Sequence, residues 1–144
     1  FNRCEGSLWD GESLWFIAST AGPVNGGQIF RYQVHLGTIT LWKQITDRSI
    51  LSMPDNITLA PWGDLIAAED NYNAEGGATH QHVRGITPDG HVYDLCRNPL
   101  NTPRDPGAEF SGPCFSPDGK ILFINLQEPR HLTIALTGPW PTTR

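Results

Sequence analysis

The sequence has few basic residues and no long apolar run. Its 144 residues include 10 lysines and arginines against 15 aspartates and glutamates, which gives a formal net charge of −5. Because nucleic-acid binding requires a basic face, this balance argues against a nucleic-acid partner. No run of 18 apolar residues is present, so we expect no membrane span. Residues 1–20 lack the features of a signal peptide, and Phe1 is not an initiator methionine, so we expect the gene product to start upstream.

Cysteines are also few, and their spacing matches no metal motif. Cys4, Cys96 and Cys114 are an odd number, without a CxxC or Cys/His pattern. We expect buried thiols, with one disulfide plus a free thiol as the alternative. The cysteines alone leave the cellular compartment undecided.

Glycine and proline are abundant, whereas long helical periods are rare. Fifteen glycines and twelve prolines punctuate short β-rich runs, which is typical of an all-β, antiparallel chain. Strands are expected over residues 7–9, 13–19, 28–34, 38–45, 57–60, 65–68, 81–87, 91–96, 113–116, 120–126 and 131–137.

The turns between these strands recur with a period near 50 residues. They divide a single domain, residues 1–144, into units at about 5–50, 55–97 and 109–137. Four strands in each of the first two units are the signature of β-propeller blades. The third unit has about three strands, and two and a half blades would leave an unpaired sheet edge. We therefore expect the chain to be the C-terminal part of a larger propeller or one piece of an assembly.

The hairpin over residues 54–70 carries polar residues at one end. Asp55 and Asn56 stand before its first strand, and Glu69 and Asp70 stand after its second. An antiparallel hairpin brings these positions to the same end, and such oxygen ligands suit Ca²⁺ or Mg²⁺. The alternative is structural: Asp55 and Asn56 cap a turn, and Glu69 begins a solvated loop. We expect Asp70 to belong to that loop.

Propeller geometry extends this candidate site to other parts of the chain. The innermost strand of each blade lines the central channel, and Glu5, Asp55 and Glu109 all precede expected innermost strands. These side chains should meet at one mouth of the channel, near Glu69. The sequence thus predicts one cation site formed by Glu5, Asp55, Asn56, Glu69 and Glu109.

Several motifs, taken in order, carry a family resemblance. They are RCEG at 3–6, PDN at 54–56, PWGDL at 61–65, ED at 69–70, GITPDG at 85–90, EFSGPCFSPDG at 109–119 and GPW at 138–140. Together they resemble the C-terminal region of PhoX-type alkaline phosphatases, and the resemblance runs from residue 3 to residue 140.

This resemblance implies a secreted or periplasmic phosphomonoesterase on a six-bladed propeller. The implied cofactor is a calcium–iron cluster, for which the five candidate residues above would be ligands. Arg3 would be a catalytic residue that binds the phosphate oxygens of the substrate, a role suited to a guanidinium fork. Arg84 is a further candidate for substrate binding. The family's N-terminal half is absent, so we expect the chain to need that segment or a partner chain to hold the whole cofactor.

Two other functions remain open at the level of the sequence. A calcium-dependent propeller hydrolase, such as a lactonase, would use a similar set of acidic and amide side chains. A non-catalytic propeller segment would act through its surface within an assembly. Iron content or phosphate-ester turnover would separate the phosphatase from the lactonase.

Overall fold

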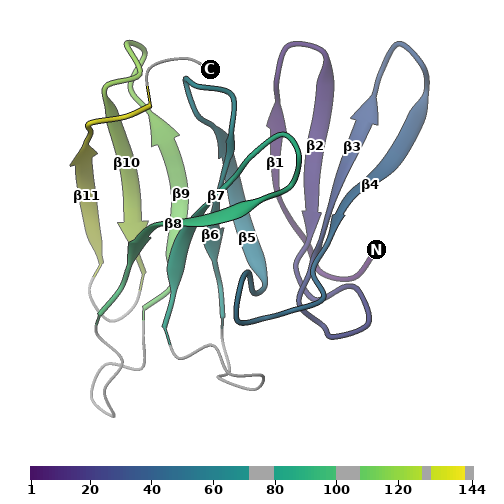
Figure 1. Cartoon of the computed structure of the whole chain (residues 1–144), viewed down its shortest axis with the longest axis horizontal. Helices are drawn as coiled ribbons and strands as arrows, with labels where there is room; N and C mark the ends of the chain where they lie inside the picture. Colours follow the sequence, from purple (N-terminus) through teal and green to yellow (C-terminus); the bar gives the residue numbers. More distant parts are fainter. Residues whose placement is uncertain (72–79, 100–107, 128–130, 142–144) are drawn as a thin grey trace.

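The chain folds into β-strands joined by turns and loops (Figure 1). The computed structural model describes residues 1–71, 80–99, 108–127 and 131–141. The strands are β1 (Cys4–Trp9), β2 (Ser13–Ala18), β3 (Gln28–Gln33), β4 (Thr38–Gln44), β5 (Pro54–Leu59), β6 (Leu65–Glu69), β7 (His82–Ile86), β8 (Val92–Arg97), β9 (Phe110–Phe115), β10 (Ile121–Leu126) and β11 (Leu132–Thr137). Each expected strand is found, and the all-β prediction is confirmed; none of the described residues is helical, so no described helix could cross a membrane.

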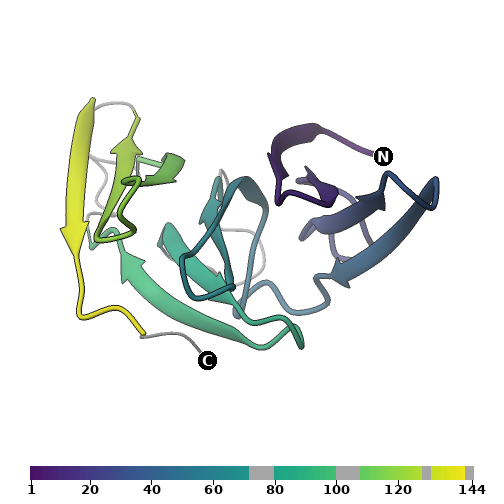
Figure 2. The same cartoon turned by 90° about the horizontal axis from the view of Figure 1, so that it is seen from above.

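The strands form three antiparallel sheets in the order in which they occur along the chain. The sheets are β1-β2-β3-β4, β5-β6-β7-β8 and β9-β10-β11. Seen from above, they stand side by side in an open arc (Figure 2). This arrangement is consistent with propeller blades that are not closed into a ring.

The hairpin turns form where the sequence supplies residues for them. Gly63 adopts a φ of 95°, and its N–H donates to the carbonyl oxygen of Ala60 at 2.9 Å. Few residues other than glycine take such an angle without strain, and the ring of Pro61 fixes its own φ at the second position of the turn. The turn therefore joins β5 to β6 as the sequence predicts.

Strand β6 is buried on both faces because it lies between two apolar cores. Leu65 and Ala67 pack against the first sheet, together with Trp15, Ile17 and Ile29. Their neighbours Ile66 and Ala68 face the third sheet and pack with Leu122 and Ile124. Successive side chains of a strand point to opposite faces, so the apolar run of β6 serves both cores.

The first strands of the three sheets lie next to one another, and each has an irregularity near its start. The register shifts between Cys4 and Ser7 in β1 and between Pro54 and Asn56 in β5. In β9 it shifts between Ser111 and Cys114. A bulge turns a side chain away from the regular pleat. Two acidic residues of the predicted site, Glu5 and Asp55, lie at these bulges.

The cysteines differ from the sequence-based expectation. All three are free, and Cys4 and Cys114 are exposed, so the prediction of buried thiols is wrong for these two. Cys4 lies at the irregular start of β1, and Cys114 points away from the core between the second and third sheets. Cys96 is half-buried, and burial raises the pKa of its thiol to about 11.

Candidate functional site

Four carboxylates and one guanidinium group gather where the first strands begin. This acid cluster consists of Glu5, Asp55, Asp70 and Glu109 around Arg3. Arg3 Nε donates to Glu5 Oε1 at 3.0 Å, and an Nη donates to Asp70 Oδ2 at 2.5 Å. Asp55 and Glu109 complete the cluster, because the charges of Asp70 and Arg3 act on both of them.

The repeated backbone of the three sheets explains why these residues meet. In each sheet the residue directly before the first strand accepts a backbone hydrogen bond from the residue that follows the second strand. The pairs are Ser19 to Arg3, Asp70 to Met53 and Gln127 to Glu109, at 2.9, 3.0 and 3.1 Å. Equivalent positions in neighbouring sheets thus lie next to one another at one end of the molecule.

The cluster has more negative charge than its one arginine neutralises. Burial, followed by the neighbouring Asp70 carboxylate, raises the pKa of Glu109 to about 8. Burial, Glu5 and Asp70 also raise the pKa of Asp55, although Arg3 and Asn56 act in the opposite direction. Like charges in a partly buried site disfavour ionisation unless a cation is present.

Two carboxylate oxygens of the cluster are left without hydrogen bonds. Asp55 is 7% exposed and Asp70 is 2% exposed, and among the described residues neither Oδ1 atom has a hydrogen-bond partner when the carboxyl groups are ionised. Without a cation, a protonated Glu109 forms a hydrogen bond with Asp70. Buried polar atoms of this kind are rare in folded proteins and often face an ion or a ligand. Hard oxygen atoms in such a setting fit Ca²⁺. Within the described ranges, however, no group of three or more His, Cys, Asp or Glu residues is arranged to hold a metal ion.

Asn56 links the acid cluster to the neighbouring sheet. Its Nδ2 donates to Asp55 Oδ2 at 2.7 Å, and its Oδ1 accepts from the backbone N–H of Gly112 at 3.2 Å. The amide oxygen that the sequence assigns to a cation therefore already has a donor. Asn56 orients Asp55 while joining β5 to β9.

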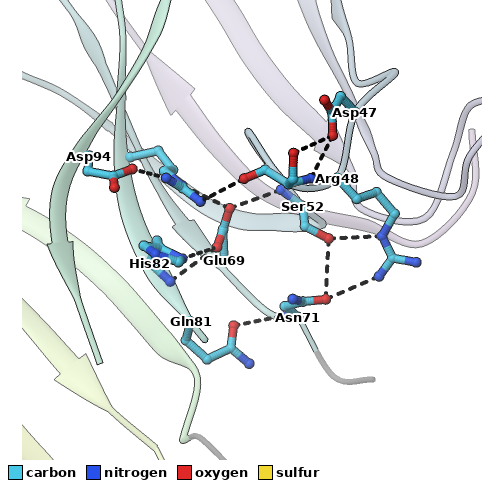
Figure 3. A network of polar contacts seen from close by, with 10 residues as sticks. Asp47, Arg48, Ser52, Glu69, Asn71, Gln81, His82 and Asp94 are labelled. Atoms are coloured by element: carbon cyan, nitrogen blue, oxygen red, sulfur yellow. Dashed lines mark hydrogen bonds and ion pairs between the residues drawn. The ribbon is translucent and has the colours of Figure 1, made fainter. Parts of the chain in front are cut away.

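Glu69 is placed away from this cluster, in a separate buried network (Figure 3). Its Oε1 accepts from the backbone N–H of Ser52 at 2.9 Å and from Arg84 Nε at 3.2 Å. Its Oε2 accepts from the backbone N–H of His82 at 3.1 Å. The carboxylate is fully buried, and all of these contacts are to protein groups. Arg84 also forms an ion pair with Asp94.

The structure therefore divides the predicted site residues into two groups. It brings together Arg3, Glu5, Asp55 and Glu109, with Asn56 beside them. It pairs the predicted ligand Glu69 with Arg84, the predicted substrate-binding residue.

Asp70 is the cluster member that sequence reasoning assigned to a loop. It follows β6 directly and is 2% exposed. The signal that could have identified it is alternation: Asp70 continues the series of Ile66 and Ala68, whereas Glu69 continues that of Leu65 and Ala67.

Comparison with known proteins agrees with the motifs in the sequence. A search of curated proteins gives no match. The family model described as "Alkaline phosphatase PhoX" matches residues 18–130, which are 113 of the 144 residues. This range contains Asp55, Asp70 and Glu109 of the acid cluster. Because the match spans well over half of the sequence, the chain belongs to the PhoX alkaline phosphatase family.

Proposed function

We propose that this chain supplies metal-binding and phosphate-binding residues to a phosphomonoesterase site. The family is one of metal-dependent phosphatases, which supports the reaction class. The observation that carries the proposal is the position of Arg3, whose guanidinium group is held by two carboxylates beside two unpartnered buried oxygens. An anion-binding group next to cation-binding groups is what a phosphate ester requires.

The metal ligands in this proposal come from the acid cluster. Glu5, Asp55, Asp70 and Glu109 would hold calcium and iron, with Asn56 orienting Asp55. When bound, such cations neutralise charge that develops on the phosphate and activate an oxygen nucleophile. Glu69 is left out because both of its carboxylate oxygens already accept hydrogen bonds from protein groups.

Arg3 is the residue proposed to contact the substrate. A guanidinium group has five N–H donors in a rigid fork, and the contacts with Glu5 and Asp70 use two of them. These two carboxylates fix the plane of the fork, so its other donors have a defined direction. A phosphate group could accept two parallel hydrogen bonds from them.

Glu109 governs the proton balance of the proposed site. With a pKa of about 8, its carboxyl group keeps a proton beside Asp70 at neutral pH in the absence of a cation. Glu109 would release this proton on taking up a metal ion, since carboxylate ligands bind in their charged form. The site should therefore bind calcium more tightly as the pH rises towards 8.

The test combines elemental analysis with turnover of a phosphate monoester such as p-nitrophenyl phosphate. The wild-type protein should contain calcium and iron, and Glu5→Gln should lose bound metal and about 100-fold or more in turnover. Asp118→Asn is the matched control, because this exposed acid lies in the turn before β10 and contacts only local groups. Full activity in Glu5→Gln would refute the proposed ligand set. Turnover of a lactone in place of the phosphate ester would refute the reaction.

We also propose that the chain works together with further propeller sheets, from a missing segment or a partner chain. Across the first sheet, Trp9, Leu14, Tyr32 and Ile39 pair in one row; Trp9 and Ile39 are 53% and 54% exposed. In the second sheet the corresponding row contains Leu65 and Ile86, which are 3% and 0% exposed because the first sheet covers them. The repeat thus supports another sheet as the cover of this row.

Family membership further supports a location outside the cytoplasm, either periplasmic or secreted. Fractionation of cells that produce the complete gene product would test this location, and recovery in the cytoplasmic fraction would contradict it.

A further inference from the structure

Glu69 and Asp70 are consecutive residues with different surroundings. Asp70 Oδ2 accepts from Arg3 in the acid cluster, whereas the Glu69 carboxylate is fully buried among Ser52, His82 and Arg84. The proposed function uses Asp70 and leaves the buried charge of Glu69 unexplained. The His82 ring adds a fourth contact, since its Nδ1 lies 3.1 Å from Glu69 Oε2. A buried carboxylate with four protein contacts is a costly feature that calls for a role.

The Glu69 network fixes the backbone on the N-terminal side of Asp70. The carboxylate joins the segment before β5, through Ser52 N–H, to strand β7, through His82 N–H and Arg84. Arg84 Nη2 also lies 3.5 Å from the carbonyl oxygen of Ser49. The strand end at Glu69 is therefore tied to two other segments of the chain (Figure 3).

A second set of contacts fixes the backbone on the C-terminal side of Asp70. The backbone N–H of Asn71 donates to Gln81 Oε1 at 2.7 Å. Asn71 Oδ1 accepts from Ser52 Oγ at 3.2 Å and from an Arg48 Nη at 3.1 Å. Asp70 itself donates its backbone N–H to Met53 O at 3.0 Å. Both neighbours of Asp70 are thus fixed, whereas its own carboxylate contacts the cluster.

The same contacts also fix the segment that carries Asp55. Ser52 donates hydrogen bonds to Glu69 and Asn71, and its hydroxyl oxygen accepts one from Arg48. Asp55 follows three residues later. The network therefore ties residues 52–55 to residues 69–71, and each of these segments brings one acid to the cluster.

We propose that Glu69 and Arg84 are positioning residues, whose buried ion pair sets the separation of Asp55 and Asp70 in the acid cluster. This inference rests on the acid cluster being the functional site. It assigns to Glu69 and Arg84 a role through the backbone, without contact to metal or substrate.

Arg84→Gln tests the proposal because positioning and simple electrostatics predict opposite results. If Arg84 acts by positioning, Asp70 shifts in the variant, and calcium affinity falls about 10-fold, as for other residues that support metal ligands. If Glu69 were instead a ligand beside Arg84, removing a positive charge would raise the affinity for a cation. Calcium titration by calorimetry separates these results.

A second readout needs no metal. In the calcium-free protein, the pKa of Glu109 is about 8 partly because Asp70 is near. Displacement of Asp70 in Arg84→Gln should lower this pKa, whereas loss of a positive charge alone would raise it or leave it unchanged. Carboxyl ¹³C NMR titration measures the value. If wild-type protein binds no calcium, the proposed function fails, yet crystal structures of the wild-type protein and Arg84→Gln still decide the positioning role. An unchanged separation of Asp55 and Asp70 in the variant would overturn it.

Matched variants complete the experiment. Lys120→Gln makes the same charge change at a side chain that is 79% exposed and should leave both readouts unchanged. Glu69→Gln combined with Arg84→Gln replaces the ion pair by an amide pair that can still hydrogen-bond, and should recover part of the lost calcium affinity. A double variant no better than Glu69→Gln alone would favour Glu69 as a ligand and overturn the proposal.

Gln81→Ala serves if Arg84→Gln does not fold. It removes the hydrogen bond to the backbone of Asn71 while leaving the buried charges in place. The proposal expects a smaller fall in calcium affinity and in the pKa of Glu109. A folded variant, of either Arg84 or Gln81, with wild-type values in both measurements would overturn it.

Discussion

Glu109 lies at a place where a carboxyl group ionises reluctantly. It is half-buried, and the charges of Asp70 and Asp55 both oppose its ionisation, while Arg3 only partly offsets them. The folded protein therefore keeps a proton on Glu109 through a pH range in which the unfolded chain has lost it. Such a difference in proton binding makes the free energy of unfolding depend on pH.

The sign of this dependence gives a prediction for Glu109→Gln. The ordinary pKa of Glu109 is 4.5 and the folded value is about 8, so ionisation destabilises the folded state as the pH rises through this window. After allowance for solvent screening, the loss for the wild-type protein is on the order of 1–3 kcal/mol. Thermal unfolding in EDTA at pH 5 and pH 9 should show the wild-type protein losing more stability than Glu109→Gln.

Calcium supplies the control for this prediction. Added at pH 9, it should restore the stability of the wild-type protein and have a smaller effect on the variant. Parallel pH profiles for the two proteins without calcium would show that Glu109 does not carry the raised pKa.

Three acids of the cluster could be predicted from the repeat, whereas Asp70 was assigned to a loop. Glu5 and Asp55 are the second residues of β1 and β5, and Glu109 comes directly before β9, so all three lie at the start of an innermost strand, as the repeat predicts. The choice between Glu69 and Asp70 depends on which of two adjacent side chains faces the cluster. A shift of one residue in the strand register would turn the other side chain towards the cluster. The irregularity between Pro54 and Asn56 shifts the pairing of β5 with β6 at this end of the hairpin, next to Glu69.

At the scale of the element, the start of β1 packs closely on the start of β5. A Cβ atom at Gly6 would lie 2.5 Å from the carbonyl oxygen of Asp55 and 2.7 Å from the Cα of Asn56. Both are backbone atoms, which cannot turn aside as a flexible side chain can. The absence of a side chain at Gly6 thus lets Glu5 and Asp55 share one cluster.

Gly6→Ala should separate the two strands. We expect a loss of about 1–3 kcal/mol in the free energy of unfolding, which is typical of overpacking, together with weaker calcium binding. Ser7→Ala is the control, because Ser7 is the next residue of β1 and is exposed. Urea denaturation measures both variants, and equal stabilities would mean that β1 and β5 are farther apart than described.

Hairpins were the most predictable elements, because local residues determine them. Turns such as Pro61-Trp62-Gly63-Asp64 contain proline and glycine at positions where the backbone needs them. The irregular starts of β1, β5 and β9 were not predicted. They arise where first strands of different sheets pack together, and no local composition marks that contact.

At the scale of the whole molecule, the first sheet has an apolar face that the described residues of the chain leave uncovered. The exposed row across β1 to β4 contains Trp9, Leu14 and Ile39. If a sheet of a partner chain covers this row, the protein in solution should be heavier than its 15.9 kDa chain.

Leu14→Asp should reduce the mass of the particle towards 15.9 kDa, because a carboxylate in that row would be buried by the covering sheet. Leu132→Asp, at a 50% exposed residue of β11, is the control and should leave the mass unchanged. Light scattering after size-exclusion chromatography measures both. A wild-type particle of 15.9 kDa would contradict a partner chain as the source of the covering sheet.

The arrangement of three sheets could be predicted from the period of the turns, whereas the number of sheets in a ring could not. Among the described residues, each sheet packs only on the adjacent sheets. The residues of one interface between sheets therefore do not indicate how many sheets the complete ring contains. The value of six came from the family resemblance alone.

The link between Arg3 and Asp70 also has a consequence for the order of folding events. These residues are 67 positions apart in the sequence, whereas every strand pair within a sheet joins consecutive strands. Contacts between distant parts of a chain form late, because loop closure costs entropy before any contact repays it. The hairpins can thus form early, and the acids meet only after whole sheets have docked. In the nascent chain the four carboxylates therefore stay apart, and their mutual repulsion arises only after the sheets have packed.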